Sequence, residues 1–360
     1  MRIVSKIFNH TPMFIRVWCF KLRSMDSPVG IYGQIFSESL KEAFDENLTP
    51  EEKADRHYVK CLTNDIIRCW YRYQALPYEY FLFKFKDRDD AGRMSFETDT
   101  DRTLTLVRVS GLANFQNEIN NKYNFYQLAK PYFKREVMKL DSVEQSDAFA
   151  AFVKKHGEAF IKPLEGSKGK GTHVYLYIDD DNAASYCKEL LIEGASWMVE
   201  ERIQQSSEMA QWNVTSVNTI RIPSFLRDGK FTVIWTRMRV GKKGAIVDNA
   251  GQGGIVVTVD PKTGVVTSDG IDEHYNHFDK HPDCGLTFKG WQVPRWDELL
   301  KTVEELHRKV FNKHIYVAWD FALTDDGWVV IEGNWGQLLG QQTASQIGVR
   351  REFHELVGDV

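Results

Sequence analysis

The stretch YVAWDFALTDDGWVVIEGNWG, residues 316–336, constrains the fold of this chain more than any other. Two apolar runs flank Asp325-Asp326-Gly327, a pattern that predicts an antiparallel hairpin closed by a three-residue loop. In that register Asp320 lies opposite Glu332, and Asn334 shares the face of Glu332. Four apolar side chains then occupy the other face, where they can anchor the hairpin in a core: Trp319, Phe321, Val329 and Ile331.

Two directly opposed carboxylates repel each other, so the pair Asp320 and Glu332 needs an explanation. A hard divalent cation such as Mg²⁺ takes carboxylate and amide oxygens as ligands, together with water and nucleotide phosphates. Asp320, Glu332 and Asn334 therefore form a candidate metal site. The alternative is a pair of solvated acids on an exposed face.

A second hairpin is predicted at FIKPLEGSKGKGTHVYLY, residues 160–177, with a loop rich in glycine and lysine. Glycine lets backbone N–H groups approach a phosphate closely, and lysine adds positive charge. A strand follows the glycines, whereas a helix follows them in a P-loop, so the loop is interpreted as a flap over a nucleotide. The alternative is a flexible surface turn. The candidate nucleotide-binding residues of this stretch are Lys162, Gly166, Ser167, Gly169 and Gly171.

Composition limits the class of protein. The net charge of −4 argues against a protein that mainly coats nucleic acid. Five cysteines without a C-x-x-C pair fit a reducing compartment. The N-terminal segment has only short apolar runs between basic residues: MRIVSKIFNHTPMFIRVWCFKLR. These runs are too short for a membrane-spanning helix or for the apolar core of a signal peptide, so we expect a cytoplasmic protein.

The pattern of helices and strands predicts an α+β protein in three consecutive parts. Residues 1–114 are expected to be mainly helical, with a helix start at Thr49-Pro50-Glu51-Glu52. Residues 115–200 form a first lobe that carries the glycine-rich flap, and residues 201–360 form a second lobe that carries the metal hairpin. The second lobe also contains an amphipathic helix over 294–311.

Basic residues gather in the second lobe. The segments SVNTIRI and IWTRMRVG flank Asp228-Gly229 as an antiparallel pair, which brings four polar side chains within a few rungs of each other: Asn218, Arg221, Arg237 and Arg239. Guanidinium groups neutralise charge near a phosphoryl group in transfer, so Arg221 and Arg237 are the predicted catalytic arginines. For Arg239 an exposed structural role is equally open.

Together these stretches resemble the ATP-grasp superfamily, in particular its sugar-transfer-associated, α-L-glutamate ligase-like branch. The resemblance runs over about residues 75–345 and rests on the order and spacing of these motifs: NNKYNFYQLAK, FIKPLEGSKGKG, WMVEERIQQSSEMAQWNVTSVNTIRI, TRMRVGKKGAIVDNAGQGGI, HPDCGLTFKG and WDFALTDDGWVVIEGNWG. It implies two α+β lobes that clasp ATP. Residues 1–115 lack the α/β substrate lobe of the best-known ligases of this fold.

The resemblance also implies roles for individual residues. Lys122 and Lys162 would contact the phosphates and the nucleotide, and Lys162 would also be a catalytic residue. Glu200 and Glu201 would hold adenine and ribose, with two surface acids beside a strand as the alternative, and Glu208 is a further ribose candidate. Asp320, Glu332 and Asn334 match the metal ligands, with Mg²⁺ expected and Mn²⁺ as a substitute. Asn218, Asp248 and Asn249 would border the substrate, although a plain Asx turn at Asp248 is an equal alternative.

The implied activity is an ATP-dependent carboxylate–amine ligase that forms an amide through an acyl-phosphate. The carboxylate would belong to a sugar acid, a glycan precursor, an amino acid or a peptide. A kinase on the same fold and a non-catalytic nucleotide-binding partner of a glycan assembly system are the alternatives. The sequence predicts neither the oligomeric state nor the substrates. His274, His277 and His281 cluster in a loop that either lines the acceptor side of the cleft or is simply solvated, with a zinc site as a weaker alternative.

Overall fold

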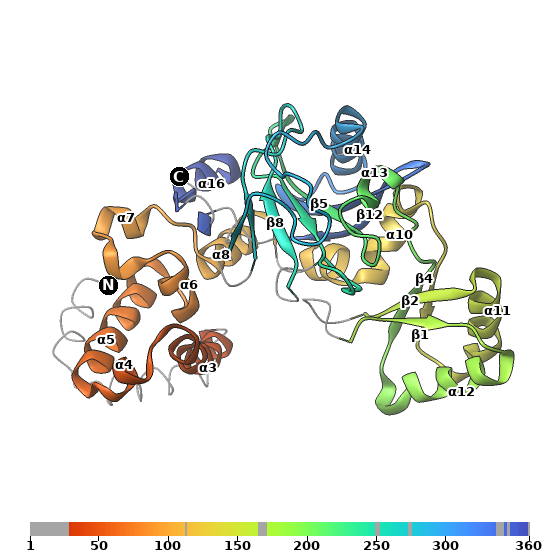
Figure 1. The fold of residues 1–360 in the computed structure, drawn as a ribbon, viewed down its shortest axis with the longest axis horizontal. Helices are drawn as coiled ribbons and strands as arrows, with labels where there is room; N and C mark the ends of the chain where they lie inside the picture. The colour runs from red at the N-terminus through yellow and green to blue at the C-terminus, as the bar shows by residue number, and fades with distance from the viewer. Residues whose placement is uncertain are drawn as a thin grey trace. The chain divides into compact units, whose positions relative to one another are not determined.

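The computed structural model describes residues 29–111, 114–164, 171–248, 253–272, 276–335, 342–343 and 346–358. The chain forms two compact units, which we describe separately (Figure 1). The first comprises Met1–Thr105, Gln337–Glu355 and Val360, and the second comprises Leu106–Gly336 and Leu356–Asp359. Residues 337–355 thus belong with the N-terminal residues, which the sequence did not indicate. The division into three consecutive parts stays a prediction.

The described part of the first unit is helical, as predicted. Its helices, of which the last two run on into the second unit, are α3 Val29–Asn47, α4 Pro50–Ala54, α5 Arg56–Tyr73, α6 Pro77–Leu82, α7 Asp90–Met94, α8 Asp99–Ser110 and α16 Arg350–Val357. The predicted helix start is confirmed: Glu52 N donates to Thr49 Oγ1 (3.2 Å), and Thr49 N donates to Glu52 Oε2 (2.9 Å). Aromatic rings dominate the core, and Phe83 stacks on Phe96 with ring centroids 4.6 Å apart.

The second unit begins with a helix and a small sheet. The helical stretch from Phe115 to Phe133 has two parts, because a π-helical turn at Phe115–Asn120 precedes α10 (Lys122–Phe133) and Asn121 caps the latter. The sheet has the antiparallel order β1-β4-β2-β3 and packs against α11 and α12. Its elements are β1 Val137–Leu140, β2 Glu158–Pro163, β3 His173–Leu176, β4 Trp197–Glu200, α11 Ser146–His156 and α12 Asp180–Leu190. The predicted hairpin of β2 and β3 is confirmed, with Ile161 opposite His173.

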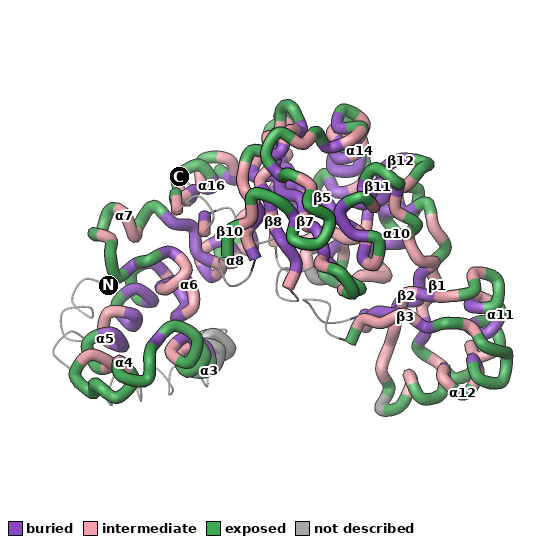
Figure 2. Tube along the Cα trace, in the orientation of Figure 1, coloured by how far each residue is buried: buried purple, intermediate pink, exposed green. Residues whose placement is uncertain are grey.

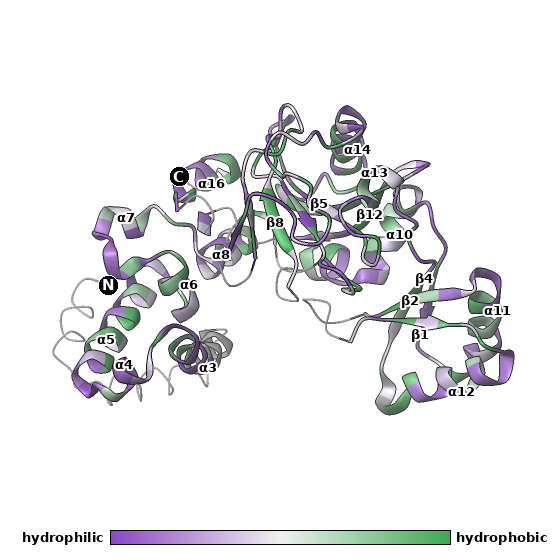
Figure 3. Cartoon of the chain, viewed as in Figure 1, coloured by the Kyte–Doolittle hydropathy of each residue, from purple (hydrophilic) through white to green (hydrophobic). Residues whose placement is uncertain are grey.

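The large sheet of the second unit has the order β10-β9-β8-β7-β5-β11-β12, and β6 also pairs with β5. Its strands are β5 Thr219–Arg227, β6 Lys230–Val233, β7 Arg237–Val240, β8 Ile255–Thr258, β9 Gly270–Ile271, β10 His277–Phe278, β11 Tyr316–Thr324 and β12 Gly327–Asn334. Buried residues run through β5, β7 and β8 (Figure 2), and β8 is hydrophobic along its length (Figure 3).

Helices complete the core of the large sheet. The amphipathic helix is α14, Trp296–Lys309, and its apolar face is buried as predicted, with Leu299, Val303 and Leu306 inaccessible to solvent. Helix α10 packs against β12, where Gly333 leaves no space for a side chain, since a Cβ there would lie 2.8 Å from Phe125 Cε2. A short helix, α13 (Ser207–Ala210), precedes β5. No helix of the described residues combines the length and the apolar character needed to cross a bilayer.

The terminal hairpin forms, but not with the predicted turn. Thr324 pairs with Gly327, so two residues close the hairpin instead of three. A bulge then follows between Asp320 and Phe321, and it leaves Ile331 without a partner on β11. Trp328 and Val330 therefore join the apolar core in place of the predicted Val329 and Ile331. Beyond the bulge Asp320 lies opposite Glu332, as predicted.

Candidate functional site

Four neighbouring strands place one charged residue each in a single row. Arg237 on β7 lies opposite Arg221 on β5, Arg221 lies opposite Asp320 on β11, and Asp320 lies opposite Glu332 on β12. Directly opposed residues in antiparallel strands point to the same face of the sheet. The predicted catalytic arginines and two predicted metal ligands therefore lie side by side.

Asp320 is the centre of this row. Its side chain is almost fully buried. Arg221 donates hydrogen bonds to both carboxylate oxygens, from Nε to Oδ1 and from Nη2 to Oδ2 at 2.6 Å. Arg239 adds a third contact, from Nη2 to Oδ2 at 2.9 Å. Burial alone would raise the pKa of Asp320, but Arg221 and Arg239 lower it to about 2. The carboxylate is therefore ionised at neutral pH.

Arg239 is a site residue whose role the sequence left open. It is not an exposed base: besides Asp320 it donates to Thr219 Oγ1 from Nε (3.0 Å) and Nη2 (2.8 Å). It pairs with Thr219 across β7 and β5, so it shares the face of Arg221. The spacing of Arg237 and Arg239, two residues apart on a strand, is the signal that could have indicated this.

Arg237 has two other positively charged side chains close to it, Arg221 and Arg239. Its exposed fraction is 9%. Burial, and after it the neighbouring guanidinium groups of Arg221 and Arg239, lowers the pKa of Arg237 to about 10. The side chain stays charged at neutral pH, and an anion beside it would relieve the repulsion. The arrangement is suited to binding an anion at this point of the row.

Glu332 and Asn334 lie next to each other on β12 as predicted. Asn334 Nδ2 donates to Glu332 Oε1 at 3.1 Å, and both residues are half-buried. The carboxylates of Asp320 and Glu332, together with the amide oxygen of Asn334, form a set of oxygen ligands that fits Mg²⁺. A cation that binds Asp320 has to share an oxygen with a guanidinium group, because both Asp320 oxygens are already hydrogen-bonded.

The predicted substrate-binding residues have structural roles within the described chain. The amide of Asn218 is inaccessible to solvent and donates to Met209 O (2.9 Å) and Asn213 O (3.0 Å), while its oxygen accepts from Gly241 N (3.2 Å). It holds the chain before β5, which leaves no group of its amide for a substrate. Asp248 is buried beside Arg239 and accepts from Thr219 N at 3.0 Å. Burial raises its pKa. Asn249 lies outside the described residues.

In the small sheet, Lys162 and Glu200 form a buried ion pair on neighbouring strands. Arg135, which the sequence did not indicate, joins them by donating from Nε to Glu200 Oε2 at 2.7 Å, and it reaches Val330 O on β12 at 2.9 Å. Burial favours the neutral acid, but the two cations lower the pKa of Glu200. Glu200 therefore anchors Lys162, and its carboxylate is not presented at the surface for a ribose.

The remaining nucleotide-binding candidates are spread over the second unit. Lys122 Nζ lies 3.5 Å from Leu164 O, immediately before the glycine-rich segment. Gly166, Ser167 and Gly169 lie outside the described residues, whereas Gly171 is described and adopts a φ of +76°, which favours glycine. Glu201 is half-exposed and accepts from Glu136 N at 3.0 Å. Glu208 is exposed on α13. Their roles in nucleotide binding stay predictions.

The histidine loop does not form a metal cluster in the part of the chain that the structure describes. His281 is buried and its Nε2 lies 3.0 Å from Gly241 O, while His277 is exposed on β10. Burial lowers the pKa of His281. His274 lies outside the described residues. The described side chains include another group of metal-ligand type, in the first unit, to which we return below.

Solved structures similar to this chain include proteins that are named synthetases or ligases. The D-alanyl-alanine synthetase A of Vibrio cholerae is 11% identical, over 67% of this chain and 65% of its own, with a TM-score of 0.43. The D-alanine-D-alanine ligase of Helicobacter pylori is 12% identical, over 67% of this chain and 61% of its own, with a TM-score of 0.42. The chain therefore spans less than two thirds of the length of these two enzymes. The D-cycloserine synthetase DcsG is 12% identical, over 69% of this chain and 73% of its own, with a TM-score of 0.41.

None of the curated proteins matches this chain. The sequence model of one family does match, and its match over residues 113–357 contains the row of charged residues, both sheets and helices α10 and α14. Because this match covers well over half of the chain, the protein has the ATP-grasp fold and belongs to the sugar-transfer associated ATP-grasp family.

Proposed function

We propose that this protein is an ATP-dependent ligase that joins a carboxylate to an amine. The observation that carries the proposal is the row Arg237, Arg221, Asp320 and Glu332, in which two arginines lie beside two carboxylates on one face of the large sheet. The arginines would bind an anion and the carboxylates a cation. Family membership supports the same reaction class. The name of the family favours a sugar acid or glycan precursor as the carboxylate, with an amino acid or peptide as the next candidate.

Asp320, Glu332 and Asn334 would hold Mg²⁺, or Mn²⁺ in its place, because they offer the oxygen ligands that both ions take. When bound, the ion would neutralise charge on the phosphates of ATP. Asp320 is ready for this role at neutral pH since its pKa is about 2. Lys162, which lies on β2 next to the glycine-rich segment, would contribute positive charge from the small sheet.

Arg221 and Arg237 would stabilise the phosphoryl group as it moves from ATP to the carboxylate. The carboxylate oxygen attacks the γ-phosphorus, the bond to the β,γ-bridging oxygen breaks, and ADP leaves. The amine nitrogen then attacks the acyl carbon of the acyl-phosphate and expels inorganic phosphate, losing a proton as the amide forms. The enzyme contributes position and charge to both steps and needs no nucleophilic side chain of its own.

The test measures ADP and phosphate release with Mg·ATP against a panel of carboxylates crossed with amines. Wild type is compared with Glu332→Gln and with Glu189→Gln, which makes the same change at an exposed glutamate on α12. We expect release that requires both partners, a loss of at least a hundredfold in Glu332→Gln and no change in Glu189→Gln. Mass spectrometry of the product should show the amide.

Three other outcomes contradict the proposal. Release of ADP without phosphate, with a hydroxyl acceptor, would indicate a kinase. Binding of ATP without turnover of any pair would indicate a nucleotide-binding partner protein. Equal rates in wild type and Glu332→Gln would remove Glu332 from the site.

A further inference from the structure

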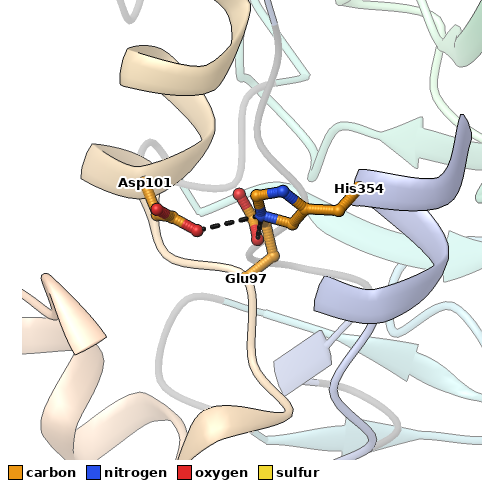
Figure 4. A group of neighbouring side chains, drawn as sticks. All are labelled: Glu97, Asp101 and His354. Carbon is orange, nitrogen blue, oxygen red and sulfur yellow. Dashed lines mark hydrogen bonds and ion pairs between the residues drawn. The ribbon is translucent and has the colours of Figure 1, made fainter. Parts of the chain in front are cut away.

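A second group of side chains with the chemistry of metal ligands lies in the first unit. Glu97 precedes α8, Asp101 lies in the first turn of α8, and His354 lies on α16. One ligand atom from each of the three lies within 4.8 Å of the other two. Figure 4 shows the three side chains pointing toward one another. The family match starts at residue 113 and therefore leaves out Glu97 and Asp101, and the proposed ligase site uses none of the three residues.

The distances in this group fit a shared ion. His354 Nε2 lies 3.0 Å from Asp101 Oδ2 and 3.2 Å from Glu97 Oε2. Zinc binds histidine nitrogen and carboxylate oxygen at about 2.0–2.2 Å, so neighbouring ligands in a tetrahedral or octahedral site are about 3.0–3.5 Å apart. Both measured distances lie in that range. Two of the three separations in the group are thus those of a metal site, and the third, between the two carboxylates, is at most 4.8 Å.

The carboxylate of Glu97 is the observation that points to a ligand. Glu97 is 1% exposed, and within the described residues neither of its oxygens accepts a hydrogen bond. The single Nε2–H that His354 can offer serves Asp101 instead. Among the described residues, the one charged partner of Glu97 that is this close, the imidazole of His354 at 3.2 Å, makes an ion pair without a hydrogen bond, which compensates a buried carboxylate only in part. A cation between the two carboxylates and the imidazole would supply the rest of this compensation.

Surrounding contacts hold the group in place. Arg350 Nη2 donates to Asp101 Oδ2 at 2.7 Å, the kind of outer contact that orients a metal-binding carboxylate. The side chain of Gln342 fixes the backbone of Glu97: it accepts from Glu97 N at 2.8 Å and donates to Glu97 O at 2.8 Å. Gln342 also accepts from Val349 N at 3.1 Å, just before α16. Both segments that carry ligands are therefore rigidly connected.

We propose that Glu97, Asp101 and His354 bind one divalent transition-metal ion, with zinc as the best match. Two carboxylates and one imidazole favour a borderline metal over Mg²⁺. His354 binds through a neutral Nε2, so any proton on that nitrogen is released to solvent as the ion enters. Because Asp101 and His354 are 253 residues apart in sequence, the ion would cross-link distant segments of the first unit and stabilise it.

The test titrates Zn²⁺ into the full-length, EDTA-treated protein against a chromophoric chelator. Excess Mg²⁺ is present so that the ligase site does not take up the probe. Cys61 Sγ lies 3.6 Å from His57 Nε2, so every protein carries Cys61→Ser to remove this exposed pair from the count. The compared variants are Glu97→Gln and His354→Gln, with His277→Gln as the control at an exposed histidine.

We expect one equivalent of Zn²⁺ bound by the reference protein and by His277→Gln, with an unfolding temperature that rises on zinc addition. Glu97→Gln and His354→Gln should bind at least tenfold more weakly and lose the rise. If the reference protein takes up no Zn²⁺, or if both ligand variants bind as tightly as the reference, the group is an ion pair only and the proposal is wrong. The result for the reference protein decides even if Glu97→Gln fails to fold.

Discussion

Replacement of Arg239 by glutamine should tighten the binding of a divalent cation at the ligase site. Arg239 and Arg221 share the carboxylate of Asp320, so the ion and the two guanidinium groups compete for the same oxygens. Removal of Arg239 frees one contact at Oδ2 and takes away one positive charge. Both effects raise the affinity for the ion, and the two remaining hydrogen bonds from Arg221 keep Asp320 in place.

The structure gives the size of the effect. The pKa of Asp320 falls from an ordinary 3.8 to about 2, although burial opposes the change, because the two arginines stabilise the ionised form. That lowering corresponds to roughly 2–3 kcal/mol. Arg239 makes one of the three contacts to Asp320, and a third of the stabilisation is roughly 1 kcal/mol, which corresponds to a gain in affinity of about three- to fivefold. The loss of repulsion between Arg239 and the ion adds to this gain.

The assay is a Mn²⁺ titration followed by electron paramagnetic resonance, in which free and bound ions are distinguished without turnover. All proteins carry Glu97→Gln, so that the site proposed in the first unit does not contribute. Arg308→Gln, on the exposed face of α14, is the matched control and should leave the affinity unchanged. An affinity in Arg239→Gln that equals the reference or falls below it would refute the idea that guanidinium groups and the cation compete for Asp320.

Three further predictions concern stability. Glu200→Gln leaves Lys162 and Arg135 buried without an anion, so urea unfolding should show a loss of about 3–5 kcal/mol, and Lys162→Met in the same chain should recover part of it. Thr49→Ala removes the cap of α4 and should cost about 1 kcal/mol in the same assay, whereas an unchanged midpoint would contradict the cap. Burial holds the pKa of His307 at about 4, below the 6.5 of an unfolded histidine. The unfolded chain therefore binds one proton more than the folded chain between pH 6.5 and pH 4, so the free energy of unfolding falls as the pH drops through this range. His307→Gln should remove about 3 kcal/mol of that fall. Parallel curves of unfolding free energy against pH for wild type and variant would contradict this prediction.

The sequence predicts elements whose signal is local. The capping residues at Thr49 and the amphipathic pattern of α14 each depend on neighbours a few positions away, and the structure confirms both. Asp320, Glu332 and Asn334 were likewise predicted as neighbours, because one hairpin contains all three.

Residues that act through long-range contacts escaped prediction. Arg135 follows α10 and meets Glu200 and Val330, and nothing in its neighbourhood indicates either partner. The amide of Asn218 was assigned to substrate because its type suits that role, whereas the fold uses it to hold three other segments. Glu97 and His354 come together only because residues 337–355 return to the first unit.

The row of charged residues depends on two irregularities that no periodic pattern contains. Ser224 on β5 pairs with Val233 on β6, and a regular continuation of that pairing would place Thr236 opposite Arg221. The chain has one extra residue near Trp235, whose φ is +55°. Arg237 therefore lies opposite Arg221 instead. On the other side Phe321 pairs with Val330, and the bulge at Ile331 brings Glu332 rather than Ile331 opposite Asp320.

A shift of one residue turns every following side chain to the other face of a sheet. Without the two insertions, Arg237 and Glu332 would therefore leave the face on which Arg221 and Asp320 lie. The predicted three-residue turn reached the correct partner for Asp320 because it, too, adds one residue to the second strand. The position of the added residue decides which side chains of β12 enter the core. Because it is added at the bulge rather than in the turn, Trp328 and Val330 lie in the apolar core. Bulges occur often beside functional sites because they re-aim single side chains, and here two of them assemble one row.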